Sequence, residues 1–397
     1  MQRYPSRPRE GWRELVESQG LVFPVTVHPD GTQTPYWDES AYYEFTLPQV
    51  EYLEGVTEEL HRMCVEGAKY LATGEMGDLG LPEGTLALAA ASMASSPPSL
   101  YGRFDLRYDG TGPAKLLEYN ADTPTGLVES AVAQWYWLED VMSYRDQWNS
   151  LHDRLVQTWR ALRLPSRTVH FAHSADEPTG EEWMTVAYLR DTADQAGLET
   201  VGLAVGDIGY DRGAGRFVDL ADRPIAACFK LYPWEDMLRE EFGTHLLAGR
   251  GGTTWIEPLW KVLLSNKALL AALWHLYPGH ENLLPAYLNK PGDLTEWIAK
   301  PLHGREGDGI RVEAADFRYD KPGRYGGEGY CFQQWAPLPD FDGNRVVLGS
   351  WVVDGKAAGL GIRESESYIT DYYARFVPHV IAAPRPDDAT VQRWLAE

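Results

Sequence analysis

The segment from Arg103 to Asp122 is the part of this 397-residue chain that most limits how it can fold. Phe104, Leu106 and Tyr108 alternate with charged residues, which is the period of a strand with one apolar face and one charged face. A turn rich in Asp, Gly and Pro follows and returns the chain. The segment is therefore predicted to form an antiparallel hairpin.

The charged face of this hairpin brings acidic residues together. With a four-residue loop, Asp105 lies opposite Glu118 and Arg103 lies opposite Asn120. Two carboxylates directly across a strand pair repel each other unless a cation sits between them. Because oxygen ligands of this kind suit Mg²⁺, Asp105, Glu118 and Asn120 are candidate metal ligands. The alternative is a solvated polar face on which Arg103 and Arg107 neutralise the acids.

The residues after the hairpin form a candidate anion site. The sequence Asp-Thr-Pro-Thr-Gly leads directly into a helical run over 127–139. The hydroxyls of Thr123 and Thr125 and the first amides of that helix are predicted to bind an anion beside the metal. An ordinary helix N-cap is the alternative interpretation, and the two are compatible.

Two lysines and a glycine-rich loop are candidates for phosphate binding. Lys300 ends a short strand, and the loop 304–309 that follows has glycines whose amides can approach a polyphosphate. Its spacing matches neither a P-loop nor a dinucleotide fingerprint, so an ordinary hairpin loop is the better interpretation of this feature alone. Lys267 opens a helix, where a cation is unfavourable unless an anion binds there. A surface lysine that extends its charge into water is the commoner case.

Two later strands complete the set of candidates. The strand 330–335 either offers an edge to an adenine ring or lies in the core. A hairpin over 346–362 turns at Asp354 and Gly355 and delivers Arg363, whose guanidinium can grip a carboxylate or phosphate through two hydrogen bonds.

Helix and strand patterns organise the rest of the chain. Thr46 and Gln49 form a capping-box pattern, and helical spacing of apolar residues continues to Gly74. A second amphipathic helix is predicted over 143–162. Later elements are a strand at 168–172, helices at 181–195 and 265–276, and a strand at 199–205. The strand, helix and strand between 168 and 205 predict a parallel βαβ unit, and an α+β region follows it.

Composition excludes several classes of protein. With 44% hydrophobic and 24% charged residues the chain is globular, and its length predicts two or three domains. The net charge of −22, from 36 basic and 58 acidic residues, argues against nonspecific binding to nucleic acids. Three cysteines without a CxxC spacing predict neither disulfides nor a cysteine zinc site. The chain lacks the apolar run of a signal peptide or membrane span, so we expect a cytoplasmic protein.

Taken in order along the chain, the motifs resemble the glutathionylspermidine synthase family, most closely its stand-alone bacterial members that consist of the synthetase part. The resemblance covers residues 12–379 and carries specific motifs in the family's order. These are Arg103-x-Asp105, Glu118 to Thr125, Lys230 to Glu235, Ser265 to Lys267, Lys300-Pro301, Gly304 to Gly307 and Gly361 to Glu364.

The resemblance implies a mixed α/β and α+β architecture, an ATP-grasp fold joined to a pre-ATP-grasp α/β domain and similar to glutathione synthetase. In this interpretation residues 1–165 hold an N-terminal helical region plus the metal-binding hairpin. Residues 166–260 are the pre-ATP-grasp βαβ domain, and residues 261–397 are the nucleotide-binding region of the ATP-grasp.

The same resemblance implies an ATP-dependent ligase, in which ATP phosphorylates a glycyl carboxylate of glutathione and an amine of spermidine displaces the phosphate. It implies ATP and Mg²⁺, with two ions, as cofactors, and a small-molecule or peptide carboxylate and an amine, a polyamine among the options, as substrates. By the resemblance, the metal ligands would be Asp105, Glu118 and Asn120. The nucleotide would contact Lys267, Lys300, Gly304, Arg305, Gly307, Gln333 and Gln334. Arg103 and Arg363 would hold the reacting carboxylate and acyl phosphate, and the substrate would contact Arg103, Thr123 and Thr125.

Three functions fit these residues. An ATP-dependent carboxylate–amine ligase is favoured, because every acid and lysine that the chemistry requires is present. The first alternative is an ATP-binding regulatory protein or pseudoenzyme that keeps the fold, and the second is phosphotransfer to a hydroxyl. The family uses serines where this chain has Thr123 and Thr125, which leaves the acid open, and the sequence determines neither the amine nor the oligomeric state. Five basic residues are expected to converge as a local positive cleft inside the acidic shell: Arg103, Lys267, Lys300, Arg305 and Arg363.

Overall fold

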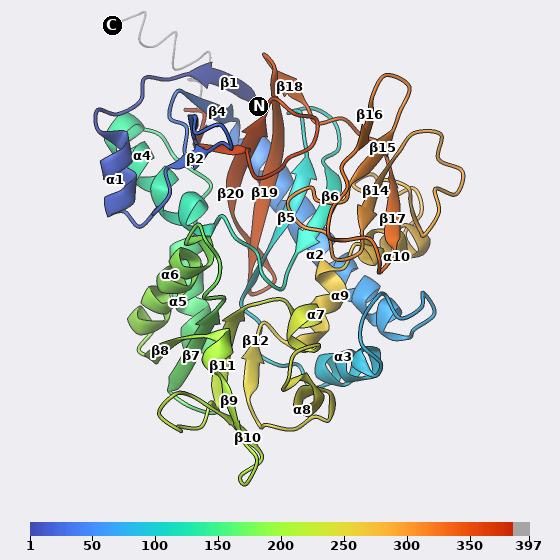
Figure 1. Cartoon of the computed structure of the whole chain (residues 1–397). Coiled ribbons are helices and arrows are strands. Elements are labelled where there is room, and N and C mark those ends of the chain that lie inside the picture. The colour runs from blue at the N-terminus through green and yellow to red at the C-terminus, as the bar shows by residue number, and fades with distance from the viewer. Residues whose placement is uncertain (384–397) are drawn as a thin grey trace, which may run out of the picture.

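Three larger sheets carry the fold of residues 1–383, the part of the chain that the computed structural model describes (Figure 1). The longest strands belong to a six-stranded antiparallel sheet with the order β21-β20-β19-β5-β6, in which β18 pairs with β19. Its strands are β5 (Tyr101–Arg107), β6 (Lys115–Asn120), β18 (Asp340–Phe341), β19 (Asn344–Val353), β20 (Lys356–Ser365) and β21 (Arg375–Val377).

A five-stranded antiparallel sheet lies beside it, with the order β13-β17-β14-β15-β16. Its strands are β13 (Ala286–Leu288), β14 (Trp297–Pro301), β15 (Arg311–Glu313), β16 (Arg318–Asp320) and β17 (Tyr330–Gln334). The third sheet is parallel, has the order β12-β11-β7-β8, and consists of β7 (Thr168–His173), β8 (Glu199–Ala204), β11 (Ala227–Leu231) and β12 (Thr254–Ile256).

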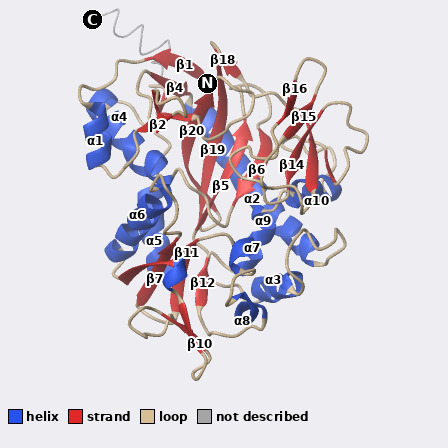
Figure 2. Ribbon diagram, viewed as in Figure 1, coloured by secondary structure: helices blue, strands red, loops and turns tan. Residues whose placement is uncertain are grey.

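Smaller sheets and the helices complete the chain; Figure 2 shows how helices and strands alternate. The small sheets join β1 (Gln2–Pro5), β4 (Ala41–Phe45) and β22 (His379–Ile381), β2 (Val25–Val27) with β3 (Gln33–Pro35), and β9 (Gly209–Asp211) with β10 (Arg216–Val218). The helices are α1 (Trp12–Ser18), α2 (Leu47–Ala72), α3 (Thr85–Ala94), α4 (Gln134–Met142), α5 (Leu151–Ala161), α6 (Glu181–Gln195), α7 (Trp234–Met237), α8 (Gly243–Leu247), α9 (Val262–Ser265) and α10 (Ala268–Leu276). Short turns are η1 (Glu129–Ala133, a π-helix), η2 (Val205–Asp207) and η3 (Leu259–Lys261).

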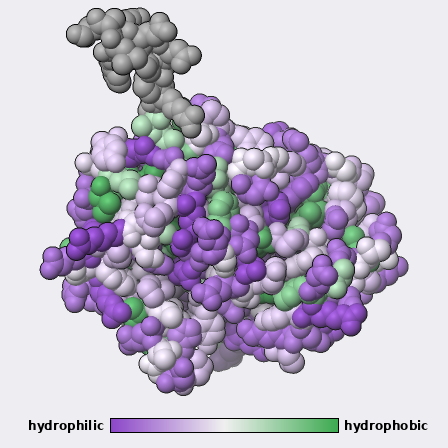
Figure 3. Space-filling model, turned by 90° about the horizontal axis from the view of Figure 1, so that it is seen from above, coloured by the Kyte–Doolittle hydropathy of each residue, from purple (hydrophilic) through white to green (hydrophobic). Residues whose placement is uncertain are grey.

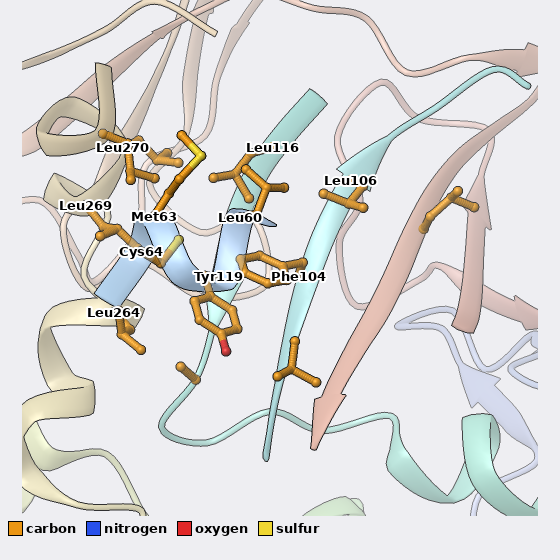
Figure 4. Packing of buried hydrophobic residues seen from close by; sticks show 14 of the residues in the cluster. Leu60, Met63, Cys64, Phe104, Leu106, Leu116, Tyr119, Leu264, Leu269 and Leu270 are labelled. Atoms are coloured by element: carbon orange, nitrogen blue, oxygen red, sulfur yellow. The ribbon is translucent and has the colours of Figure 1, made fainter. Parts of the chain in front are cut away.

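Helix α2 packs against the hairpin and joins the two antiparallel sheets. Its N-terminus has the predicted capping box, because the Gln49 amide donates to the Thr46 hydroxyl and the Gln49 side chain accepts from the Thr46 amide. Figure 4 shows its apolar side packed between the hairpin residues and α9 and α10. At Gly67 a Cβ would lie 2.9 Å from Leu269, so this glycine permits the close approach of α10.

The βαβ prediction is confirmed and one helix prediction is wrong. β7 and β8 are parallel and α6 lies between them in the chain, at almost the predicted bounds. The helix predicted over 143–162 begins only at Leu151. The reason is that the backbone before it pairs with β20, through bonds from Ser150 to Ala358 and from Leu360 to Trp148. These bonds replace the helical ones that the apolar spacing favours.

The helix predicted over 265–276 begins later, as α10 at Ala268, and Ser265 ends the preceding helix α9. The side chain of Asn266 accepts a hydrogen bond from the Ala268 amide at 2.9 Å, and Lys267 donates its amide to the Leu302 carbonyl at 2.9 Å. Lys267 therefore stands just before α10, buried and beside Glu118, so the interpretation as a surface lysine is wrong.

The three-part division at residues 165 and 260 stays a prediction. The six-stranded sheet joins β5 and β6 from the first of these segments to β19, β20 and β21 from the last. Seen from above, the surface is largely hydrophilic with small separate hydrophobic groups (Figure 3). Within residues 1–383, every helix is too short or too polar to cross a membrane.

Candidate active site

The β5–β6 hairpin has the register that its charged face predicts at the functional positions. Asp105 lies opposite Glu118, although the connection over 108–114 is longer than the expected loop. An extra residue in β6, Leu117, forms a bulge beside Asp105, and this shift restores the predicted pairing. The carbonyl of Leu117 accepts a hydrogen bond from Lys300 Nζ at 2.7 Å, so the bulge also contacts the neighbouring sheet.

The protein's own cations neutralise the two facing carboxylates. Asp105 accepts hydrogen bonds from Arg103 Nε at 2.8 Å and from Arg363 Nη2 at 2.5 Å. Glu118 Oε2 lies 3.2 Å from Lys267 Nζ. Arg103 thus neutralises an acid of the hairpin, as the alternative interpretation expected. The other two cations, which sequence alone did not assign to these acids, are Lys267, just before α10, and Arg363 on β20.

The hairpin forms one wall of a cleft of about 870 Å³, its mouth included, and β14, β17 and the loop 304–310 form the opposite wall. The cleft brings together ten residues singled out in the sequence: Asp105, Glu118, Lys267, Lys300, Gly304, Arg305, Gly307, Gln333, Gln334 and Arg363. Four basic and four acidic residues line it, so it is balanced in charge and not positive as predicted. That balance still distinguishes the cleft from a chain whose net charge is −22.

Lys300 is fixed between the two antiparallel sheets. Its Nζ donates to Gln333 Oε1 at 2.9 Å, and Gln333 Nε2 donates to the Leu116 carbonyl at 2.9 Å. The Gln333 side chain is therefore engaged in holding Lys300. Its strand, β17, is paired with β13 on one side and β14 on the other, so the core-strand interpretation of 330–335 is the correct one.

The pKa values of Glu118 and Lys300 are both lower than their ordinary values, for opposite reasons. Burial would raise the pKa of Glu118, but the charges of Lys267 and Lys300 outweigh burial and lower that pKa below its ordinary value. Burial lowers the pKa of Lys300 to about 8, although the charge of Glu118 opposes the change. Near neutral pH Glu118 is therefore an anion and Lys300 is close to its titration point.

The glycine-rich loop is attached to the parallel-sheet region through Arg305. Arg305 donates to the Glu235 carboxylate at 2.8 Å and to the Thr123 hydroxyl at 2.7 Å. Gly307 has a φ of +69°, and a Cβ there would lie 3.0 Å from Ile369, so the loop packs against residues 369–371 with no space for a side chain. The loop is thus held on one side by the contacts of Arg305 and on the other by packing against residues 369–371.

A second, smaller pocket opens beside the cleft and shares Glu306 and Arg363 with it. It encloses about 570 Å³ with its mouth, and Arg103, Thr125 and Glu181 line it. Further lining comes from the acid Asp371 and the aromatic residues Phe23, Tyr36, Tyr372 and Phe376. Burial and the charge of Glu129 raise the pKa of Glu181 to about 8, although a hydrogen bond with Thr125 opposes the shift.

The remaining predicted residues lie around the rim of these two spaces. Asn120 donates its amide to Glu118 Oε1 at 2.8 Å, Thr123 accepts from Arg305, and the Thr125 carbonyl accepts from Arg103 Nη1 at 2.5 Å. Neither Asn120 nor Thr123 lines the cleft. Arg107 points elsewhere, because its Nε donates to the Pro337 carbonyl at 2.9 Å, and it does not neutralise the two acids.

Sequence reasoning missed a buried ion pair below the hairpin and the acids of the smaller pocket. Lys230 Nζ lies 2.5 Å from Asp122 Oδ1, and both side chains are buried. The other Asp122 oxygen accepts from the Trp234 amide at 2.9 Å, which ties β6 to β11 and α7. The motif from Lys230 to Glu235 was the available signal, but nothing local in it identifies Asp122 or Arg305 as partners.

The donor set around Asp105 and Glu118 fits Mg²⁺ that is held partly by a nucleotide. Two carboxylates and the Asn120 amide supply oxygen ligands on one hairpin face, and Lys267 and Lys300 lie beside them. Within residues 1–383, no cluster of three or more His, Cys, Asp or Glu side chains could hold a metal alone. Phosphate oxygens would therefore have to complete the coordination, as is usual for Mg²⁺.

The chain has a mixed α/β fold that resembles a solved glutathione synthetase-like structure. A glutathione synthetase-like effector from Globodera pallida superposes with a TM-score of 0.59 and 9% sequence identity, over 94% of this chain and 96% of that one. At this level of identity the likeness concerns the fold alone.

The family follows from the sequence comparisons. The family model described as "Glutathionylspermidine synthase preATP-grasp" matches residues 3–382, so the chain belongs to the glutathionylspermidine synthase family. A protein of Haemophilus influenzae named "Putative acid--amine ligase" is 43% identical over 88% of this chain and 92% of its own length. Named relatives of this kind make the chain a C–N bond-forming ligase by class.

Two larger relatives match over part of their length. Trypanothione synthetase of Crithidia fasciculata is 27% identical over 72% of this chain, and the match covers 48% of the relative. The bifunctional glutathionylspermidine synthetase/amidase of Escherichia coli is 27% identical over 70% of this chain and 49% of its own length. The chain thus spans about half the length of these two relatives.

Proposed function

We propose that the chain is an ATP-dependent carboxylate–amine ligase with an ATP-grasp fold, and that it forms an amide through an acyl phosphate. One observation carries the proposal: Asp105 and Glu118 face each other in a single cleft with Lys267, Lys300 and Arg363. Phosphoryl transfer to a carboxylate concentrates negative charge on a small volume, and fixed cations there stabilise the transition state. The position of this cleft between two antiparallel sheets supports the ATP-grasp assignment.

The residues of the cleft have separate roles in this proposal. ATP supplies the phosphoryl group that activates the acid, and Mg²⁺ neutralises its phosphates. Asp105, Glu118 and Asn120 would hold the metal, and Lys267 and Lys300 would contact phosphate oxygens. Gly304, Arg305 and Gly307 would cover the phosphates with the loop. No side-chain nucleophile is required, because the amine itself attacks the activated carbonyl.

Arg103 and Arg363 would hold the acid at the boundary between the two spaces. Both guanidinium groups contact Asp105, and Arg363 lines the cleft and the smaller pocket. A carboxylate bound there would replace part of their contact with Asp105. Guanidinium groups suit this exchange because they can bind carboxylate and phosphate with paired hydrogen bonds.

The smaller pocket would take the amine. Its acids Glu181, Glu306 and Asp371 and its aromatic wall are the chemistry that recognises a cation. It adjoins Arg363, so an amine there would lie beside the activated carboxylate. We therefore propose a cationic amine, such as a polyamine, and a peptide carboxylate such as glutathione as the first pair to test.

The test is a screen for phosphate release with Mg²⁺ and ATP, in which acids and amines are supplied in pairs and each reactant is omitted in turn. The expected result is release that depends on both reactants and on Mg²⁺, with a product lighter than the two substrates by one water in mass spectrometry. Chelation of Mg²⁺ is the matched control and should stop release. ATP binding without release from any pair would favour a regulatory protein, and a phosphorylated hydroxyl product would favour phosphotransfer.

A further inference from the structure

Glu129 is a buried acid next to the smaller pocket whose bonding is incomplete. Its side chain is 0% exposed, and it begins the π-helical turn η1. Oε1 accepts a hydrogen bond from the Tyr36 hydroxyl at 2.6 Å, while Oε2 has no hydrogen-bond partner among residues 1–383. A buried carboxyl oxygen without a partner destabilises a fold, and π-turns are frequent at functional sites. Stability alone therefore does not account for Glu129.

Tyr36 connects this acid to the pocket. Its ring lines the pocket and is fixed by Phe23 and Phe376, with ring centroids 4.5 Å and 5.4 Å away. Burial and the charge of Glu129 raise the pKa of Tyr36 well above its ordinary value, so the phenol keeps its proton. That proton is donated to Glu129, and the lone pairs of the phenol oxygen remain as acceptors.

An ammonium group has only donors, so a pocket that binds one needs acceptors with fixed direction. Glu306 and Asp371 supply charge on the pocket wall, and Glu181, whose pKa burial raises to about 8, adds to it above that pH. A hydroxyl that could rotate would have to be oriented by the cation on binding, which costs conformational entropy. The contact with Glu129 removes that freedom, because the carboxyl oxygen accepts the phenol proton.

We propose that Glu129 and Tyr36 act as a positioning pair that gives the pocket its selectivity for a cationic amine. Glu129 accepts the Tyr36 proton, and the Tyr36 oxygen then accepts an N–H of the amine. Glu129 acts through Tyr36 and does not touch the amine. This inference rests on the proposed function, in which the smaller pocket holds the amine substrate.

The chain offers a matched control for Tyr36. Tyr43 is also buried, and its hydroxyl donates to Glu364 Oε2 at 2.6 Å, the same distance as in the Tyr36 pair. Glu364 keeps its bonds from Arg3 and Arg375 when that hydroxyl is removed. Tyr43→Phe therefore removes an equivalent buried hydrogen bond away from the pocket.

The experiment measures spermidine binding by titration calorimetry for wild type, Tyr36→Phe, Glu129→Met, the double variant and Tyr43→Phe, with thermal melting as the check on folding. Tyr36→Phe is expected to weaken spermidine binding by about tenfold to a hundredfold, the range for a hydrogen bond to a charged group. Glu129→Met removes the acceptor and should weaken it as well, and the double variant should be no worse than Tyr36→Phe, because the two residues act as a unit. Tyr43→Phe should bind like wild type.

A second readout separates this inference from the proposed ligase activity. Hydroxylamine, added with glutathione in place of the amine, is a neutral nucleophile: its nitrogen attacks the activated carbonyl, phosphate leaves and a proton passes to solvent. Tyr36→Phe should keep hydroxamate formation while it loses spermidine binding. Spermidine binding without hydroxamate or phosphate release in wild type would refute the ligase proposal alone. Equal binding by wild type and Tyr36→Phe, or absence of binding by wild type, would overturn the positioning pair.

Discussion

The cleft and the smaller pocket are neighbours that treat their carboxylates in opposite ways. In the cleft, Asp105 and Glu118 each have a basic partner within 3.2 Å. In the pocket, Glu181, Glu306 and Asp371 form no ion pair with any residue in the described range 1–383. Both spaces share Glu306 and Arg363 in their walls, so the contrast arises over a short distance.

This difference indicates which kind of ligand the cleft and the smaller pocket each suit. Paired acids and bases can exchange partners, so a cleft of this kind can accept a metal on its acids and phosphates on its lysines without a change in net charge. Acids that lack a partner repel each other, and the raised pKa of Glu181 is the sign of that repulsion and of burial. The two arginines of the pocket, Arg103 and Arg363, pair with Asp105 and not with these acids, so a ligand can bring the cation that the acids lack.

The largest effect is expected in the cleft, from removal of the facing acids. Glu118→Ala and Asp105→Ala should each lower Mg²⁺- and ATP-dependent phosphate release by about a thousandfold or more, because the metal would lose its protein ligands. The melting temperature of Glu118→Ala should stay close to that of wild type, whereas Asp105→Ala should melt lower, because it leaves the buried Arg103 without its carboxylate. Asp109→Asn, at the exposed turn of the same hairpin, is the control. Phosphate release that persists in both alanine variants would contradict the metal assignment.

Arg363 lines both spaces and contacts Asp105, so its loss should uncouple them. Arg363→Ala is expected to keep ATP binding but lower product formation by about a hundredfold to a thousandfold, as for other groups that stabilise developing charge. Calorimetry with a nonhydrolysable nucleotide measures the first and mass spectrometry the second. Arg311→Ala, a change at an exposed arginine, should leave both unchanged. If Arg363→Ala made product at the wild-type rate, its proposed role would be wrong.

The pocket should respond to pH in a way that the cleft does not. Glu181 has a pKa of about 8, raised by burial and by Glu129 and Glu306, while Thr125 and Arg103 oppose the shift. Below that pH the carboxyl is neutral and cannot pair with an amine cation. The kcat/KM for the amine should therefore rise about tenfold per pH unit toward pH 8 and then level off.

Glu181→Gln tests this assignment directly, because it cannot titrate. The variant should have a lower kcat/KM for the amine and lose the rise toward pH 8, while KM for ATP stays as in wild type. The same raised pKa means that wild type loses stability as pH rises from 4.5 to about 8, since the folded state holds the proton more tightly. Glu181→Gln should thus melt higher than wild type above pH 8. An unchanged pH profile would remove Glu181 from the pocket's chemistry.

The smallest effect on activity is expected from the ion pair of Glu235 and Arg305, which only orients the glycine-rich loop. Glu235→Gln weakens the hold on Arg305, whose second partner, Thr123, remains. KM for ATP should rise about threefold to tenfold with little change in kcat, the range of one weakened charged hydrogen bond. Steady-state kinetics at saturating acid and amine measures this. A larger fall in kcat than in ATP affinity would show that Arg305 takes part in the chemistry.

Much of the site followed from local patterns in the sequence. The alternation of β5 and the turn after it predicted that Asp105 faces Glu118, and the structure has that pairing. The prediction assumed a shorter loop, and the bulge at Leu117 compensated for the difference. The predicted pairing of Asp105 with Glu118 was therefore correct, but it depends on a bulge that the sequence pattern did not predict.

Other parts could not be predicted because they depend on contacts between distant segments. The apolar spacing over 143–162 favours one helix, but backbone bonds to β20 take residues 148–150 out of it. The role of Gln333 is similar: its strand pattern is ordinary, and only the packing of β17 against the hairpin turns its amide toward Lys300. A local pattern cannot report which distant group satisfies a polar side chain.

The sequence by itself determined the facing carboxylates, the long capped helix, the βαβ unit and the family, because each depends on periodicity, turn chemistry or motif order within a short stretch. Only the tertiary structure decided which cations neutralise those carboxylates and that a second, acid-lined pocket adjoins them. That pocket takes residues from β2, β5, β20 and β21, from α6 and from the loops between these and other elements, and its charge state follows from their burial together. Burial and charge coupling are properties of the assembled fold, so no single segment of the chain encodes them.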